Sequence, residues 1–131
     1  ALGKRLYLHV SDLVDFKRTP KVSETESIRP IIIEMTSNRL GATAVLDAGQ
    51  KIVGIITDGD LRRMLQREED LTLVKASQIM SKNPRTIETS EMAVAALRLM
   101  EQSKITQLIA TENGRYVGMI HMHDILKEGI V

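Results

Sequence analysis

The chain has 131 residues, the length of one compact domain or of two small units that depend on each other. Its net charge of +1 at pH 7 gives no field that would attract nucleic acid or an anionic membrane. It has no cysteine for disulfides or thiolate metal sites, and its apolar runs are too short to span a bilayer. Because no signal-peptide pattern opens it either, we expect a cytoplasmic protein.

The first half of the chain predicts an alternation of short strands and helices. Ser27 is suited to cap a helix, and Pro30 fits the first turn of that helix because its missing N–H has no intrahelical acceptor there. In chain order the expected elements are a helical turn at 10–14, an extended piece at Val22, a helix after Ser27, strands at 43–46 and 52–56 around a turn at 47–50, and a closing helix from Thr57 through Leu65.

The second half predicts the same order of elements. Its main helix places Ala93, Ala96, Leu97 and Met100 on one face at helical spacing. The expected elements are a helical turn at 76–80, an extended piece at Thr86 and Ile87, that helix, strands at 107–110 and 116–120 around a turn at 111–114, and a shorter closing helix from His121.

The two halves are copies of one unit. The segment 53–61 reappears as 117–125, and Pro20 pairs with Pro84 at the same offset of 64 residues. We therefore divide the chain at 1–73 and 74–131. Because a copy of about 60 residues buries little apolar area alone, we expect the two copies to pack sheet to sheet around a pseudo-twofold axis, with two clefts between them.

The closing element Gly54-Ile55-Ile56-Thr57-x-x-Asp60, together with the repeat, resembles the CBS-domain pair or Bateman module. The resemblance covers essentially the whole chain and implies an α/β (α+β) fold of two tandem βαββα repeats. In that family the pair binds nucleotides between its repeats, with the Asp on the ribose hydroxyls and the Thr at the phosphate. This implies such roles for Thr57 and Asp60, whereas in the second copy Asp124 matches and His121 replaces the hydroxyl residue.

A finer resemblance concerns the segments 54–63 and 121–131 and the opening 1–6. They are similar to the C-terminal half of arabinose-5-phosphate isomerases of the KpsF/GutQ type, which feed Kdo and lipopolysaccharide biosynthesis. In that family the isomerase chemistry belongs to an N-terminal SIS domain, which this chain lacks. The resemblance therefore implies a regulatory region that is non-catalytic by itself and requires no cofactor, within a parent isomerase.

The pair Thr57 and Asp60 also has the spacing of a helix capping box, so capping and ligand binding are both open and mutually compatible. His121 is a poor N-cap by residue type, yet Asp124 still follows it three residues later, which favours a ligand role. Arg62 and Arg63 suit bidentate contact with phosphate or carboxylate. The alternative for both is a solvated helix face paired with Glu68 or Glu69.

The segment His121-x-His123-Asp124 has metal-site spacing, but no third ligand is evident. Phosphate or carboxylate contact, or pH sensitivity, is the better interpretation. We expect one nucleotide site around Thr57 and Asp60 and a divergent second one, with no catalytic residue and no metal ligand. The expected ligand-binding residues are Thr57, Asp60, Arg62, Arg63, Thr86, Ile87, His121, His123 and Asp124.

The leading hypothesis is a sensor of AMP, ATP or the nucleotide sugar CMP-Kdo that modulates an attached isomerase domain. CMP-Kdo is suggested as a feedback ligand by its place in the same pathway. Arg62 and Arg63 would suit its sugar-acid carboxylate. The alternative is an assembly module without a ligand. We expect a homodimer of such pairs within a larger homo-oligomer. The core and the dimer surface are expected to consist of Met and Ile side chains, namely Met35, Met64, Met92, Met100, Ile31 and Ile32.

Overall fold

The structure is a computed structural model that describes residues 7–38, 40–67 and 70–130. The opening segment 1–6 and the proposed partners Glu68 and Glu69 lie outside the described residues. The chain divides into two compact units. The middle unit is Pro20–Pro84, and the terminal unit joins the segment that ends at Thr19 to the segment that begins at Arg85. In the part of the chain that is described, no helix is long and apolar enough to cross a membrane.

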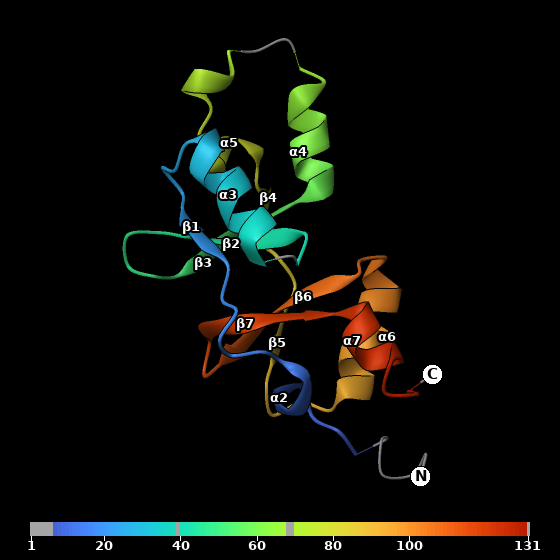
Figure 1. Cartoon of the computed structure of the whole chain (residues 1–131). Helices are drawn as coiled ribbons and strands as arrows, with labels where there is room; N and C mark the ends of the chain where they lie inside the picture. Colours follow the sequence, from blue (N-terminus) through green and yellow to red (C-terminus); the bar gives the residue numbers. More distant parts are fainter. Residues whose placement is uncertain (1–6, 39, 68–69, 131) are drawn as a thin grey trace. The chain divides into compact units, whose positions relative to one another are not determined.

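The middle unit is a four-stranded sheet with helices packed against it (Figure 1). The sheet order is β1-β2-β3-β4; β1 runs parallel to β2, and the other neighbours are antiparallel. In chain order the elements are β1 (Lys21–Ser23), α3 (Ile28–Asn38), β2 (Ala42–Leu46), β3 (Ile52–Thr57), α4 (Asp58–Leu65), the 3-10 helix η1 (Leu71–Leu73), α5 (Ala76–Ile79) and β4 (Ser81–Lys82).

Aliphatic side chains from every layer of the middle unit form its core. All five residues of β2 are buried, as expected for an interior strand. In α3, Ile28, Ile31 and Met35 are buried at the spacing of one helix face. They pack with Val45, Ile56 and Met64 in one cluster, which fixes α3 and α4 against the sheet.

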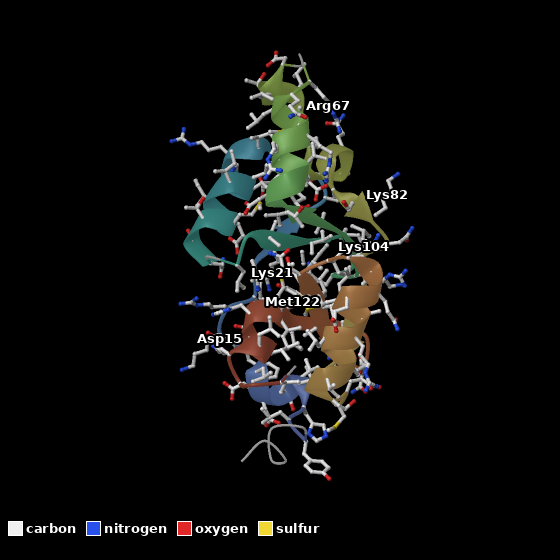
Figure 2. All side chains as sticks on the ribbon, turned by 90° about the vertical axis from the view of Figure 1, so that its right-hand side faces the viewer. Asp15, Lys21, Arg67, Lys82, Lys104 and Met122 are labelled. Carbon is white, nitrogen blue, oxygen red and sulfur yellow. The ribbon has the colours of Figure 1, made fainter. Side chains whose placement is uncertain are left out.

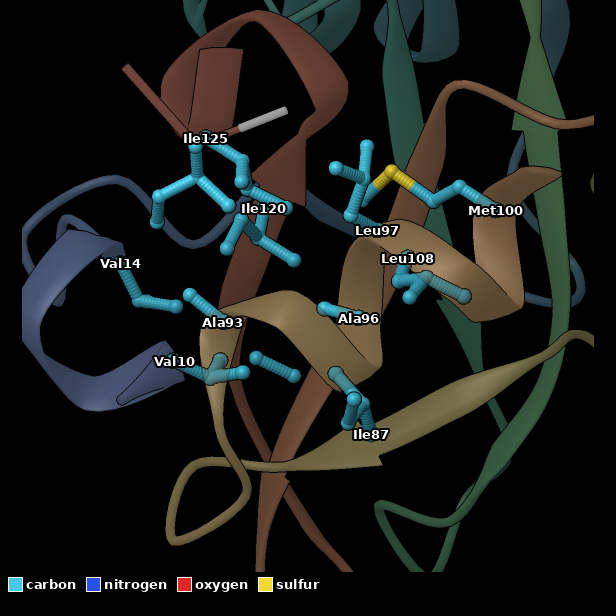
Figure 3. Close-up of a cluster of buried hydrophobic side chains, with 12 residues drawn as sticks. Val10, Val14, Ile87, Ala93, Ala96, Leu97, Met100, Leu108, Ile120 and Ile125 are labelled. Carbon is cyan, nitrogen blue, oxygen red and sulfur yellow. The ribbon is translucent and has the colours of Figure 1, made fainter. Parts of the chain in front are cut away.

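The terminal unit has a three-stranded sheet in the order β5-β6-β7, with β5 parallel to β6 and β6 antiparallel to β7. The predicted apolar face of α6 is confirmed, since Ala93, Ala96, Leu97 and Met100 are all buried in the core (Figure 3). The elements are α2 (Val10–Leu13), β5 (Thr86–Glu88), α6 (Ala93–Ser103), β6 (Gln107–Glu112), β7 (Arg115–His121) and α7 (Met122–Leu126).

Each unit contains the predicted order βαββα, as β1-α3-β2-β3-α4 and as β5-α6-β6-β7-α7. The predicted turn at 111–114 is too long. Strand β6 continues to Glu112, which pairs with Arg115, so only Asn113 and Gly114 remain in the loop. Their φ angles of 53° and 80° are both positive, as a type I′ hairpin turn requires.

The compact units do not coincide with the sequence copies 1–73 and 74–131, because each short helix packs with the other copy. Helix α2 joins the terminal unit: Val10 N–H donates to the Glu91 carbonyl (2.9 Å) and Ala93 N–H to the Leu8 carbonyl (2.7 Å). Helix α5 joins the middle unit, where Ala76 N–H donates to the Glu26 carbonyl (2.8 Å). The short helices are therefore exchanged between the copies.

Candidate functional site

The first candidate group lies where β3 ends and α4 begins. Thr57 has extended backbone angles (φ −111°, ψ 171°), and its hydroxyl accepts a hydrogen bond from the Asp60 N–H (3.3 Å). The Asp60 carboxylate returns the interaction by accepting from the Thr57 N–H (2.8 Å). The capping box is therefore present, and it places both side chains at the N-terminus of α4.

Asp60 does more than cap the helix. It is 4% exposed, and its carboxylate is surrounded by donors. Oδ2 accepts from the backbone N–H and the hydroxyl of Thr57 (2.8 and 3.0 Å), and Oδ1 accepts from Arg63 Nη2 (2.6 Å) and from the Ser81 hydroxyl (3.0 Å). A carboxylate has about four acceptor positions, so this buried charge is fully compensated.

The two arginines that follow the motif differ in their surroundings. Arg63 pairs with Asp60 while its side chain stays 62% exposed, so part of the guanidinium faces solvent. Arg62 is also exposed on α4. In Figure 2, which draws all side chains, the label Arg67 marks the chain just beyond α4 and the label Lys82 marks β4. Both arginines lie in the last turn of α4, and only Arg63 is shown to reach back to Asp60 in the first turn, where its guanidinium provides positive potential for a phosphate or carboxylate.

The second candidate group repeats this arrangement at the start of α7. The His121 N–H donates to Asp124 Oδ2 (2.9 Å), and His121 Nδ1 accepts from the His123 N–H (3.0 Å). The expectation that His121 is a poor N-cap is therefore wrong, because its Nδ1 serves as the acceptor for a backbone N–H of the first turn. Capping accounts for Asp124, so the presence of Asp124 no longer favours a ligand role.

Two residues of these groups were missed by reasoning from the sequence. Lys127 stands three residues after Asp124, 3.8 Å from its Oδ1, as Arg63 stands three residues after Asp60. The shared spacing in the two copies was the signal that could have found it. Ser81 had no such signal, because only the pairing of β4 with β3, Ser81 opposite Ile55, brings it to Asp60.

The remaining predicted site residues belong to the terminal unit. Ile87 on β5 is buried in the core there, so its side chain serves packing, whereas Thr86 is exposed. His123 is exposed on α7. The ligand-binding role of all three stays a prediction. Among the described residues, no group of three or more His, Asp or Glu side chains is arranged to hold a metal ion.

The glycine of the motif has a packing function in both copies. A Cβ on Gly54 would lie against the Met80 side chain, 2.8 Å from its Cγ. A Cβ on Gly118, whose φ is +154°, would lie 2.8 Å from Val14 Cγ1. In each unit the chain that follows the exchanged short helix therefore passes directly over this glycine.

A groove of about 610 Å³ lies on the middle unit between α3 and η1. It is mainly apolar and does not include Thr57 or Asp60. Near it, Ile32 (43%), Ile33 (56%) and Leu73 (72%) are strongly exposed for apolar side chains. The lining residues are Ser27, Ile28, Arg29, Ile32, Ile33, Leu71 and Thr72. Contiguous apolar surface of this kind often marks an interaction site.

Comparison with solved structures gives the same fold. A CBS domain protein from Pyrobaculum aerophilum complexed with AMP superposes with a TM-score of 0.81 at 24% identity, covering 92% of this chain and 97% of that one. The CBS domain of a bacterial CNNM/CorC family Mg²⁺ transporter in complex with ATP superposes with a TM-score of 0.80 at 17% identity, covering 97% and 90%. At these identities the likeness establishes the fold.

Sequence comparison gives the family. Arabinose 5-phosphate isomerase KdsD of Yersinia pestis is 38% identical over 132 residues, covering 100% of this chain and 40% of the isomerase. The chain thus spans about two fifths of the length of the curated relatives it matches. The model of the CBS domain matches residues 10–67 and again 76–130. The chain therefore belongs to the CBS domain family, as a tandem pair of CBS domains.

Proposed function

We propose that this CBS pair is a regulatory module that binds a nucleotide at the group around Thr57 and Asp60. The observation that carries the proposal is the Asp60 carboxylate, held at the N-terminus of α4 with Arg63 beside it. A carboxylate in a fixed orientation suits a ribose, because a ribose hydroxyl can donate to one of its oxygens. The solved CBS structures in complex with AMP and ATP support a ligand of this class.

The same group has a place for the anionic part of such a ligand. The helix N-terminus contributes a partial positive charge, and the exposed Arg62 and Arg63 contribute guanidinium donors. An adenine nucleotide would use these donors for phosphate, and CMP-Kdo would use them for phosphate and for the sugar-acid carboxylate. We place Thr86, His121, His123 and Asp124 in a second, divergent site whose basic partner is Lys127.

The regulated activity in this proposal is aldose-ketose isomerisation of a sugar phosphate. It is supported by the similarity of the chain to arabinose 5-phosphate isomerases, over two fifths of their length. A ligand regulates such an enzyme only if it binds one arrangement of the protein more tightly than another. Nucleotide binding would therefore change the isomerase activity of the full-length protein, and the isolated pair would convert no ribulose 5-phosphate.

Isothermal titration calorimetry of the chain with AMP, ATP, CMP and CMP-Kdo tests the proposal. We expect heat with at least one of them, and loss of that heat in Asp60→Asn. The isosteric substitution is preferable to Asp60→Ala. The Asp60 carboxylate is buried and accepts from four donors, and truncation to Ala would leave all four donors without this acceptor. Asp70→Asn, at the start of η1, is the matched control and should bind normally. Absence of heat with all four nucleotides would contradict the proposal.

A second function, assembly of a larger oligomer, is favoured by the exposed apolar surface of α3. Helices α3 and α6 have the same length, and Ile33 of α3 corresponds to Arg98 of α6, which is also exposed. Because the fold accepts Arg at this position, the exposed isoleucine is not needed for folding. It is then available for self-association.

Sedimentation velocity of the chain and of Ile33→Arg tests assembly separately from nucleotide binding. If α3 forms the interface, we expect the chain to dimerise and Ile33→Arg to shift it toward the monomer without changing nucleotide affinity. A strict monomer at high micromolar concentration would argue against assembly through this surface.

A further inference from the structure

Ser81 is a contact of Asp60 from a distant part of the middle unit. Its hydroxyl donates to Asp60 Oδ1 at 3.0 Å across a sequence separation of 21 residues. It is held there by the pairing of β4 with β3, in which Ser81 lies opposite Ile55. Arg63 donates to the same oxygen at 2.6 Å. Neither contact belongs to the capping box, which uses Oδ2.

The donors on Asp60 already fill its acceptor positions, so a ligand hydroxyl can reach Oδ1 only if one of them leaves. Arg63 carries a charge and bonds at the shorter distance, whereas Ser81 is a neutral donor and the more easily displaced of the two. We propose that the Ser81 hydroxyl occupies the position of a ligand hydroxyl and competes with the nucleotide for Asp60. This inference rests on the proposed function and adds the regulation of that site.

Displacement of Ser81 would act on one of the two chain connections between the units, the one at Pro84 and Arg85. Strand β4 has only Ser81 and Lys82, and its pairing with β3 is limited to these residues. Asn83 follows with a φ of 52°, then Pro84, and the terminal unit begins at Arg85. Proline fixes φ and asparagine holds a left-handed conformation, so the connection is short and stiff. Nucleotide binding at Asp60 would thus release β4 and loosen this connection.

The terminal unit lacks this competitor. Two residues after α2 the chain has Asp15, where Ser81 stands two residues after α5. A carboxylate cannot donate to another carboxylate, and Asp15 instead accepts from the Lys17 N–H (2.9 Å). The Asp124 side chain is 27% exposed, whereas that of Asp60 is 4% exposed. The competition is therefore a property of the middle unit.

Calorimetric titration of Ser81→Ala with AMP and ATP tests the inference. Removal of one neutral competing hydrogen bond should tighten binding about three- to tenfold relative to the unsubstituted chain. A merely structural role of Ser81 would weaken binding or leave it unchanged. Ser77→Ala is the matched control, because Ser77 is exposed on α5 and its substitution leaves the Asp60 contacts intact. It should bind with unchanged affinity.

Hydrogen exchange of the peptide spanning 80–84 provides the second readout. In the unsubstituted chain, saturating nucleotide should increase exchange in this peptide while α4 becomes better protected. In Ser81→Ala, the peptide should already exchange faster before nucleotide is added. If nucleotide binds but Ser81→Ala leaves affinity and exchange unchanged, the competition is wrong and the proposed function stands. If no variant binds AMP or ATP, both are wrong for adenine nucleotides.

Discussion

At the scale of single residues, a side-chain oxygen at the third position of a helix is a recurrent capping device in this chain. Before four of the helices, the backbone N–H of the preceding residue donates to a side chain three residues later: at His9 (to Asp12, 2.8 Å), Thr57 (to Asp60, 2.8 Å), Lys75 (to Gln78, 2.7 Å) and His121 (to Asp124, 2.9 Å). Capping is thus common to all four. Burial, together with the additional donors Arg63 and Ser81, is what distinguishes Asp60.

The cap at α7 can be tested by substitution of His121. Replacement by Ala removes the acceptor for the His123 N–H, and loss of an N-cap costs about 1 kcal/mol. We expect His121→Ala to lower the free energy of unfolding by that amount in urea denaturation, and His121→Asn to restore it. His123→Ala is the control, because the backbone N–H that makes the bond remains. Equal stability of His121→Ala and the unsubstituted chain would show that the imidazole does not cap.

Glu88 stabilises the hairpin turn that follows β6. Its carboxylate accepts hydrogen bonds from the Thr111 hydroxyl and from the N–H groups of Gly114 (3.2 Å) and Asn113 (2.8 Å). These donors, Thr111 foremost, hold the pKa of Glu88 below its ordinary value of 4.5. Because the pKa is lower in the folded than in the unfolded state, the stabilisation is complete above the ordinary value and is lost as the pH falls through the folded-state pKa.

We therefore expect Glu88→Gln to lower the urea midpoint at neutral pH. Its difference from the unsubstituted chain should shrink once the pH falls below the ordinary value of 4.5. Urea titrations across this pH range measure both effects. Glu101→Gln, on the exposed side of α6, serves as the control. A difference that persists undiminished at acid pH would mean that the Glu88 charge does not stabilise the turn.

At the scale of elements, each sheet depends on a glycine that lets another segment pass close to a strand. In the middle unit this is Gly54 of β3 beneath Met80, and in the terminal unit it is Gly118 of β7 beneath Val14. The motif that runs from Gly54 to Asp60 therefore combines a packing requirement in the strand with a cap at the start of the helix. Both requirements hold before any ligand is considered.

Gly54→Ala tests this packing. A Cβ would lie too close to Met80, and over-packing of this kind costs about 1–3 kcal/mol. Gly59→Ala is the matched control, since its Cβ would meet no atom closer than 3.4 Å. Alanine in place of glycine within α4 should stabilise the helix by about 0.5–1 kcal/mol. Thermal unfolding of the two variants should therefore shift in opposite directions, and equal shifts would exclude this explanation.

At the scale of the whole molecule, the exchange of short helices means that neither unit coincides with one copy of the repeat. Val10 of α2 is fully buried and Val14, just after it, nearly so, among side chains of α6, β6 and α7 (Figure 3). The N-terminal segment is thus part of the core that the second copy builds. A change in this segment acts first on the terminal unit and only indirectly on the copy that follows it in sequence.

Val10→Ala should demonstrate this dependence. Truncation of a fully buried valine costs about 1–3 kcal/mol. We expect hydrogen exchange to accelerate in peptides of 85–130 and to remain slow in 20–67. Val22→Ala, in the core of the middle unit, should give the reverse pattern. Loss of protection in 20–67 upon Val10→Ala would show that the two units unfold together.

The sequence by itself determined the repeat, the order βαββα in each copy and most element positions, because hydrophobic periodicity and turn residues are local signals. It also predicted the capping box of Thr57 and Asp60, since the motif is contiguous. Boundaries were less accurate where pairing decides them, as at Glu112 opposite Arg115. His121 was misjudged because residue preferences rank imidazole low as a cap, although its nitrogen accepts the bond.

Only the tertiary structure decided which copy each short helix packs with, because the same apolar pattern would satisfy either core. It alone brought Ser81 to Asp60, since that contact depends on the pairing of β4 with β3 across 21 residues. It likewise showed that Asp60 is buried and saturated with donors, whereas Asp124 is partly exposed. Local pattern fixes which elements form, but long-range pairing and burial set the environment of each charge.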